Sequence, residues 1–262
     1  MLSRITSLVL RYWFSLKASP SRIIEMFYLP VIQILIWGIF TTFMAGNSSW
    51  FAKSAGIFLA AIMLWDTFFR CQNSMITSFL EELWTRHLRH LFTSPLHPAE
   101  FAAASLAFGI IRTAIGVIPT AIVAALLCNY NILSMGFPLL AFFGNLMLMG
   151  WWIGLFLIAA LLIFGIEIEG LAWMASTIFA PISAVYYPVS ALPSWLQPVA
   201  LALPSTHVFE GMRGVLFGQG FMWGHFWAAL ALNLVCFALA GLAFTLAFER
   251  ARVTGKLLNP GE

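Results

Sequence analysis

Long apolar stretches joined by short polar connections make up most of the chain. A helix needs about 20 consecutive, mainly apolar residues to cross the hydrocarbon core of a bilayer. Six stretches are close to this length or exceed it, and they cover residues 27–45, 55–80, 99–127, 136–164, 171–187 and 224–248. The pattern predicts an all-α membrane protein with six transmembrane helices.

Residues 1–25 have the periodicity of an amphipathic helix instead. Apolar positions form one face and polar positions another, namely Leu2, Ile5, Val9, Tyr12 and Leu16 against Arg4, Arg11 and Ser15. We therefore expect these residues to form a helix that lies in the membrane interface. Two roles stay open for it: a simple anchor, or a lever that couples a cytoplasmic partner to the spans.

The stretch between the fifth and sixth spans is apolar but interrupted by prolines. Pro188, Pro193, Pro198 and Pro204 prevent residues 179–213 from crossing a bilayer as one helix. A segment that enters a bilayer and then breaks must pair its backbone groups with protein or with water in a cavity. Such segments are typical of the places where membrane proteins move their substrates.

The composition indicates that lipid is the main solvent of this chain. Of its 262 residues, 61% are hydrophobic and 9% are charged. Ordinary soluble domains carry about 25% charged residues, so the chain cannot cover a globular surface with polar groups. The net charge of +3 is small and gives no indication of a nucleic-acid partner.

The distribution of Lys and Arg predicts the orientation of the spans. One side of the predicted topology receives Arg4, Arg11, Lys17, Arg22, Arg86, Arg89, Arg250, Arg252 and Lys256. The other side receives only Lys53 and Arg213. The positive-inside rule then places both termini in the cytoplasm, which agrees with an even number of spans. The proline-rich stretch falls on the outer side.

The connection between the second and third spans predicts a short amphipathic helix over residues 81–94. Its charged and titratable positions include Glu81, Glu82, Arg86, His87 and Arg89. Such a short helix is not stable alone, so we expect either a docked partner or a solvated turn that only orients two spans. Pro98 and Glu100 suit the first turn of the third span.

The connection between the fourth and fifth spans carries Glu167 and Glu169. These carboxylates are either solvated or a second contact to a cytoplasmic partner. No metal site is predicted, because His87 and His90 can share a helix face but no third ligand stands at a suitable spacing.

Three charged residues lie well inside predicted spans, away from their ends. Asp66 and Arg70 are four residues apart, so they face the same side of a helix and can pair. Charges within a span usually face the bundle interior or water. The pair is therefore either a structural clasp or part of a translocation or gating element. Arg112 has no acid three or four residues away, so it needs a partner on another helix or a shallow position from which it snorkels.

Three features together resemble the permease subunits of type-2 ABC exporters, the class that includes polysaccharide, lipo-oligosaccharide and drug exporters. The first is the order of an interface helix and six spans with both ends cytoplasmic. The second is Glu82 followed by Leu91 and Ser94-Pro95-Leu96, which is similar to the family's coupling helix. The third is similar to the family's signature before the last span, and comprises Tyr187-Pro188-Val189-Ser190, Leu192-Pro193, Trp195-Leu196-Gln197, Leu203-Pro204-Ser205-Thr206, Glu210 and Arg213. The sequence departs from the family at Trp84-Thr85-Arg86-His87-Leu88, where a Gly-Thr-Leu-Glu run is frequent.

The resemblance implies a homodimer in the bacterial inner membrane with two copies of a separate ATP-binding subunit. It gives partner-coupling roles to Glu81, Glu82, Arg86, His87, Arg89, Glu167 and Glu169. The sequence contains no G-x-x-x-x-G-K-[ST] phosphate loop. We therefore expect no enzymatic activity and no cofactor in this chain, with ATP and Mg bound by the partner.

The resemblance also gives the broken stretch a shape. Residues 188–222 are expected to form a re-entrant helical hairpin, with helices over 194–203 and 206–217. Ser205 or Thr206 is the expected N-cap of the second helix. The implied outer-gate residues are Pro188, Pro193, Trp195, Pro204, Glu210 and Arg213, with Glu210 and Arg213 paired. A hairpin that only fills space is the alternative.

The expected function is ATP-driven export of a lipid-linked glycan, a lipid or a hydrophobic drug-like substrate by alternating access. A membrane-embedded enzyme that modifies lipids or glycans is one alternative, although no convergent catalytic set is visible. An ion-coupled secondary transporter is another, although its spans would be broken in both halves. A further group of aromatic residues either lines a substrate path or belongs to membrane belts and packing: Trp151, Trp152, Trp173, Tyr186, Tyr187 and Trp195.

Overall fold

The structure is helical wherever the chain is described. The computed structural model describes residues 2–47, 49–84, 97–128 and 130–254. Its α-helices are α1 (Leu2–Lys17), α2 (Pro20–Asn47), α3 (Ser49–Trp84), α5 (Pro98–Leu127), α6 (Phe137–Phe164), α7 (Glu169–Ile182), α8 (Gln197–Leu201), α9 (Pro204–Leu216) and α10 (Trp223–Thr254). Short 3-10 turns are η1 (Ile132–Met135), η2 (Ile166–Ile168) and η3 (Val189–Ala191). The predicted all-α class is confirmed for these residues.

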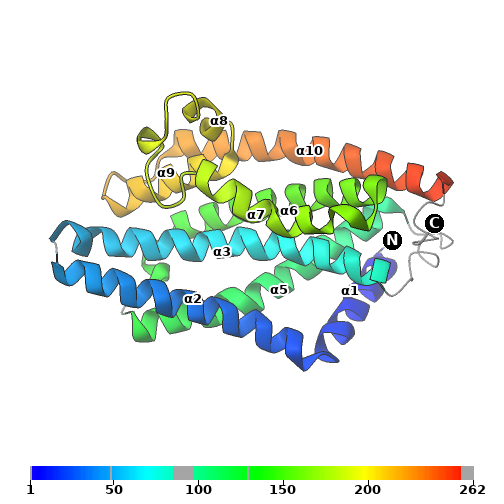
Figure 1. Ribbon diagram of the computed structural model, residues 1–262, viewed down its shortest axis with the longest axis horizontal. Helices are drawn as coiled ribbons and strands as arrows, with labels where there is room; N and C mark the ends of the chain where they lie inside the picture. Colours follow the sequence, from blue (N-terminus) through cyan, green and yellow to red (C-terminus); the bar gives the residue numbers. More distant parts are fainter. Residues whose placement is uncertain (1, 48, 85–96, 129, 255–262) are drawn as a thin grey trace.

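The long helices run side by side along the longest axis of the molecule (Figure 1). Helix α6 lies among them and packs extensively against both α3 and α10, while α2 packs against α3 and α5. A helix that is apolar all round is typically buried. In α6, Leu146, Met149, Ile158 and Leu161 are all fully buried. The core of the bundle therefore forms around α6.

Among the described residues, four helical segments are long and apolar enough to cross a membrane, judged by length and composition. They are Arg22–Phe43 within α2, Pro98–Leu127, Phe137–Phe164 and Trp223–Val253 within α10. The chain is thus a multi-pass membrane protein.

Helices α3 and α7 were also expected to span. α3 is long but carries Asp66 and Arg70 among its apolar residues. α7 has 14 residues, which gives a length of about 21 Å, shorter than the roughly 30 Å hydrocarbon core. The count of six spans stays a prediction.

Helix α1 has two apolar faces, whereas its sequence periodicity suggested one. From the predicted apolar face, Tyr12 and Leu16 are buried and cluster with Ala104 and Phe108 of α5. A second apolar face is exposed, formed by Leu10, Trp13 and Phe14. The expected interface helix therefore contacts protein through one face, and the second face is the one available to lipid.

The proline-rich stretch reverses the chain direction beside the bundle. α7 ends at Ile182, and Ala184 adopts a φ of 51° in the turn that follows. The chain then passes through η3 and α8 before α9 returns along α6 and α10 (Figure 1). Whether this hairpin dips into a membrane stays a prediction.

The expected N-cap of α9 was wrong. The helix begins at Pro204, and Leu203 is its N-cap. Proline is favoured at the first helical position because its φ is already fixed near the helical value. Ser205 and Thr206 therefore lie within the first turn, and Ser205 Oγ hydrogen bonds with Ser183 Oγ at 2.7 Å instead of capping the helix.

Candidate functional site

Two ion pairs tie the N-terminal helices to the end of α3, directly before residues 85–96. Arg11 Nη2 donates to Glu82 Oε2 at 2.7 Å, and Arg22 Nη1 donates to Glu81 Oε1 at 2.5 Å. The side chain of Glu82 is 2% exposed, whereas that of Arg11 is 45% exposed. A docked protein would therefore meet the guanidinium of Arg11 before it met this carboxylate.

A third ion pair ties α1 to the beginning of α5, directly after the same residues. Arg4 Nη1 lies 3.5 Å from Glu100 Oε2. Glu100 also accepts a hydrogen bond from the backbone N–H of His97 at 3.1 Å, so its predicted position in the first turn of the helix is confirmed. We refer to the pairs Arg4–Glu100, Arg11–Glu82 and Arg22–Glu81 as the N-terminal clamp.

The clamp is supported by apolar packing of α1 on α5. The Tyr12 ring lies 5.5 Å from the Phe108 ring, measured between centroids. Burial raises the pKa of the Tyr12 phenol, and the negative charge of Glu82 raises it further. Tyr12 therefore stays a neutral packing residue, and α1 cannot shift without disturbing α5.

The remaining predicted coupling residues are only partly described. Arg86, His87 and Arg89 lie outside the described residues. Glu167 lies in η2, and Glu169 begins α7 and accepts a hydrogen bond from Trp173 Nε1 at 3.2 Å. Helices α6 and α7 meet at the same end of the bundle as the last turn of α3 (Figure 1).

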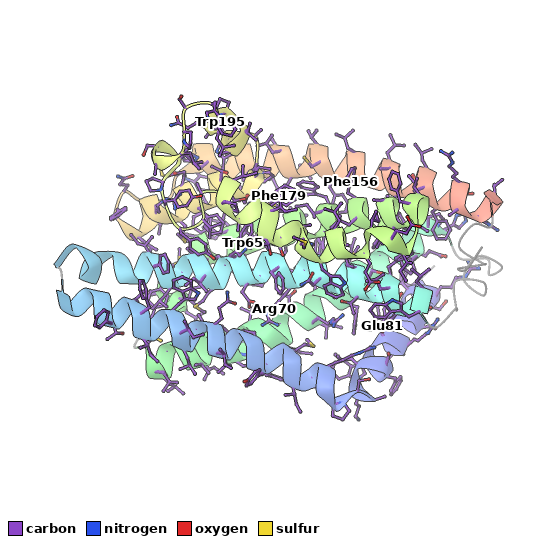
Figure 2. All side chains as sticks on the ribbon, in the orientation of Figure 1. Trp65, Arg70, Glu81, Phe156, Phe179 and Trp195 are labelled. Carbon is purple, nitrogen blue, oxygen red and sulfur yellow. The ribbon has the colours of Figure 1, made fainter. Side chains whose placement is uncertain are left out.

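The predicted pairing of Asp66 with Arg70 is confirmed. Arg70 Nε donates to Asp66 Oδ2 at 2.6 Å, and Arg70 Nη1 donates to the carbonyl oxygen of Met26 at 3.1 Å. Arg70 thus joins α3 to α2, and it points toward α2 from the middle of α3 (Figure 2). Both side chains are about nine-tenths buried. The pair is a clasp between two helices in this structure.

Arg112 lies next to this clasp. Its guanidinium carbon is 5.8 Å from the centroid of the Phe108 ring, within the range of a cation–π contact. Arg112 also lines a cavity of about 410 Å³ together with Asp66 and Arg70. The three intramembrane charges predicted from the sequence therefore gather at one cavity, which the sequence did not indicate.

The predicted pairing of Glu210 with Arg213 is also confirmed, at 3.0 Å between Arg213 Nη2 and Glu210 Oε1. Both side chains of the pair also form hydrogen bonds to backbone groups outside α9. Arg213 Nη2 donates to the carbonyl oxygen of Ala184 at 3.0 Å, and Glu210 accepts from the backbone N–H of Val189 at 2.8 Å. The pair therefore fastens α9 to the turn after α7.

Three of the other predicted gate residues are prolines near the starts of helical segments. Pro188 precedes η3, Pro193 precedes α8 and Pro204 begins α9. Trp195 is 72% exposed and projects from the hairpin away from the bundle (Figure 2).

A pair of histidines in the same region was missed by sequence reasoning. His207 Nδ1 and His225 Nδ1 lie 3.1 Å apart, and His207 Nε2 lies 2.9 Å from the carbonyl oxygen of Leu201. A carbonyl only accepts, so His207 Nε2 carries a proton, and a neutral His207 accepts from His225 through Nδ1. Burial lowers the pKa of His207. The 18-residue separation gave no local signal of this contact.

A polar network between α6 and α10 was missed as well. Asn233 Nδ2 donates to the backbone oxygen of Asn145 at 3.0 Å and to its Oδ1 at 3.1 Å. Asn233 Oδ1 accepts from Trp152 Nε1 at 3.1 Å. Both asparagines are buried. This network packs two helices together, so Trp152 serves packing in this structure.

Comparison with known proteins identifies the family of the chain. A family model for the ABC-2 type transporter matches residues 5–217. The chain belongs to this family. Among curated proteins none matches the chain.

Members of the ABC-2 family are the membrane permease subunits of ABC transporters, and they work with a separate ATP-binding subunit. The chain is therefore an ABC transporter permease subunit rather than a catalytic enzyme itself. The matched residues include the Glu210–Arg213 pair and every residue of the N-terminal clamp except Arg4. Its recognition from sequence motifs as a type-2 ABC permease is confirmed.

Proposed function

We propose that this permease exports its substrate, and that the N-terminal clamp transmits the motion of the ATP-binding subunit to the spans. The clamp is the observation that carries the proposal. Its pairs join α1 and α2 to the two helix ends on either side of residues 85–96. A partner that moves this connection also moves α1 and α2, because ion pairs with buried or partly buried carboxylates hold their arginines.

The functional unit is a homodimer in the bacterial inner membrane with two ATP-binding subunits, which bind ATP and Mg. Both termini are cytoplasmic, and six helices span the membrane. The position of α1 and of the last turn of α10 at one end of the bundle supports this orientation (Figure 1). The excess of Lys and Arg on the side of the predicted topology that holds both termini also supports it.

The hairpin acts as the outer gate. It is fastened by the Glu210–Arg213 pair to the turn after α7, at a place where the backbone is already irregular. Irregular backbone at this position is suited to a change of shape, since few helical hydrogen bonds have to break. Alternating access then moves a lipid-linked glycan, a lipid or a hydrophobic drug-like molecule outward.

The test is transport by the purified complex of permease and ATP-binding subunit in proteoliposomes. Outward movement of a fluorescent lipid is measured by its accessibility to an added quencher, with and without ATP. We expect ATP-dependent movement that stops when the catalytic glutamate of the ATP-binding subunit is changed to glutamine. The permease alone should hydrolyse no ATP. Transport by the permease without any ATP-binding subunit contradicts the proposal.

A further inference from the structure

Stripes of residues from α2 and α3 face each other and form one long groove. On α3 the lining residues are related by spacings of three, four and seven positions, and they are Asp66, Phe69, Arg70, Asn73, Ser74, Thr77 and Trp84. On α2 they recur in the same way, at Arg22, Met26, Pro30 and Gln33. Such spacings keep residues on one side of a helix. We refer to this cavity, which Arg112 of α5 and Trp173 of α7 complete, as the arginine groove.

The arginine groove is elongated. Asp66 and Trp84 are 18 positions apart in one helix, which corresponds to about 27 Å along the axis. The cavity volume of about 410 Å³ lies within the range of about 300–1,000 Å³ that is usual for small-molecule sites. The groove begins at Arg22 and Trp84, near the clamp, and ends near the middle of α3. Its shape suits a long molecule aligned with the helices.

Positive charge predominates among the lining residues. Arg22, Arg70 and Arg112 line the arginine groove, and Asp66 is the one carboxylate that the described residues contribute to the lining. A guanidinium offers five N–H donors. In the described part of the chain, Arg70 uses Nε and Nη1 for its bonds to Asp66 and Met26, and Arg22 uses Nη1 for Glu81. Arg70 and Arg22 therefore keep further N–H donors that an anionic group can use.

Two buried polar atoms of the groove have no hydrogen-bond partner within the described structure. They are Ser74 Oγ and Asn73 Oδ1. Ser74 is 2% exposed, so bulk water does not satisfy it. A buried polar atom without a partner costs free energy. The Asn73 oxygen accepts only, so its missing partner is a donor such as a hydroxyl group.

Apart from Gln33 and Thr77, the remaining lining is apolar and aromatic, and it opens outward. Met26 and Pro30 lie along α2, and Phe69, Trp84 and Trp173 are each 38–47% exposed. An acyl or isoprenoid chain fits against such side chains, whereas a free phosphate or a soluble sugar gains nothing from them. Aromatic rings near the end of a membrane helix also suit the region of lipid headgroups.

From these contacts we infer that the arginine groove binds an anionic amphiphile with a hydroxyl-bearing headgroup, such as a phosphoglycerol or sugar-phosphate lipid. The acidic group contacts Arg70 and Arg112, a headgroup hydroxyl donates to Asn73 Oδ1, and the apolar chain leaves past Phe69. The identification of this amphiphile as the exported molecule rests on the proposed function. The binding itself does not.

Photocrosslinking in the assembled transporter tests the binding. The photoreactive residue p-benzoylphenylalanine replaces Phe69, which lines the groove, and in a matched control it replaces Phe156 of α6, which is exposed on another helix. The complex is reconstituted in nanodiscs that contain tritiated phosphatidylglycerol or tritiated phosphatidylcholine. We expect position 69 to capture phosphatidylglycerol about fivefold more than phosphatidylcholine, and position 156 to capture both equally.

Variants of one arginine identify the source of this selectivity. Arg112→Gln removes a positive charge without removing the Asp66–Arg70 clasp, so selectivity at position 69 should fall while the complex still assembles. Arg112→Lys should restore it. Arg252→Gln removes an exposed charge of α10 and should change nothing.

Several results overturn the inference. They are equal capture of the two lipids at position 69, cross-linking of position 69 to a second copy of the chain, and loss of lipid capture on addition of inorganic phosphate. The last result indicates a site for a free anion. Charge-selective capture without ATP-dependent transport supports lipid binding in the groove and contradicts the proposed function. ATP-dependent transport without selective capture supports the proposed function and contradicts lipid binding in the groove.

Discussion

The guanidinium of Arg70 occupies the space that a Cβ atom on Gly116 would need. An added Cβ would lie 2.6 Å from Arg70 Nε and closer still to Nη1. Gly116 therefore lets α5 approach α3 closely enough to bury the Asp66–Arg70 clasp, as small residues do at helix contacts in membranes. The clasp depends on three helices, because Arg70 also reaches Met26 of α2.

Gly116→Ala should therefore displace Arg70 and weaken the clasp. We expect a loss of about 1–3 kcal/mol, as for other overpacked sites, seen as a lower Tm of the purified complex. Gly144→Ala is the matched control, because a Cβ on Gly144 of α6 meets nothing within 4 Å. If both variants have the Tm of the wild type, the close packing of Arg70 against Gly116 has no energetic role.

The Arg11–Glu82 pair of the clamp can be separated from direct docking of Glu82 by a double-mutant cycle. Glu82→Gln removes the negative charge that pairs with Arg11, and Arg11→Met removes the guanidinium that pairs with a carboxylate that is 2% exposed. Each change should cost roughly 1–3 kcal/mol, and the double variant should cost less than the sum.

The same cycle, measured on the affinity for the ATP-binding subunit, distinguishes the two roles. If the clamp positions the connection, both single variants should weaken binding by a similar factor. If Glu82→Gln weakens binding and Arg11→Met does not, Glu82 contacts the partner directly, which contradicts the clamp.

Arg213→Ala should release the turn after α7 from α9. The change removes the hydrogen bonds to the carbonyl oxygens of Ala184 and Val185 and the pair with Glu210. Hydrogen–deuterium exchange of residues 184–191 should become faster, and the transporter should leak or lose transport. Glu210→Gln keeps an acceptor for the Val189 N–H, so its effect on exchange at Val189 should be smaller. If hydrogen–deuterium exchange of residues 184–191 is unchanged in Arg213→Ala, the Glu210–Arg213 pair does not hold this turn against α9.

The His207–His225 contact should weaken as the pH falls. The pKa of His207 is lowered by burial, so the contact is fully formed above the usual histidine pKa of about 6.5. It weakens as the pH drops from there toward the lowered pKa of His207, since a protonated His207 no longer accepts through Nδ1 and two protonated rings repel each other.

Hydrogen exchange of residues 201–207 between neutral and mildly acidic pH, corrected for the intrinsic exchange rate, measures this opening. We expect the wild type to open on acidification, and His207→Gln, which retains a donor for the Leu201 carbonyl, to show no pH dependence. The same pH dependence in His207→Gln assigns the opening to another group.

Asn233 should stabilise the contact between α6 and α10. Asn233→Leu removes its bonds to Asn145 and Trp152, and interhelical hydrogen bonds in membranes contribute about 0.6–2 kcal/mol. We expect a lower Tm of the complex. Thr245→Val in α10 is the control, since Thr245 bonds only within its own helix among the described contacts. Equal Tm values of the two variants contradict a packing role for the network.

Relationships within one helix were predictable from the sequence. The Asp66–Arg70 and Glu210–Arg213 pairs followed from spacings of four and three residues, and the position of Glu100 in the first turn of α5 followed from its distance to Pro98. These relationships depend only on helical geometry, which is the same in every α-helix. The permease family was also predictable from the sequence, because its motifs are short runs of neighbouring residues.

Relationships between helices were decided by the tertiary structure. Arg11 and Glu82 are 71 positions apart, and Asn145 and Asn233 are 88 apart. Their contacts depend on how each helix is rotated and shifted against its neighbours, and that is fixed by packing of the whole bundle. The composition and the length of the apolar stretches by themselves determined that the chain lies in a membrane and that its backbone is helical. In the hydrocarbon region a helix pairs the backbone N–H and C=O groups within one segment. Only the packed bundle brought Arg22, Arg70 and Arg112 to one groove.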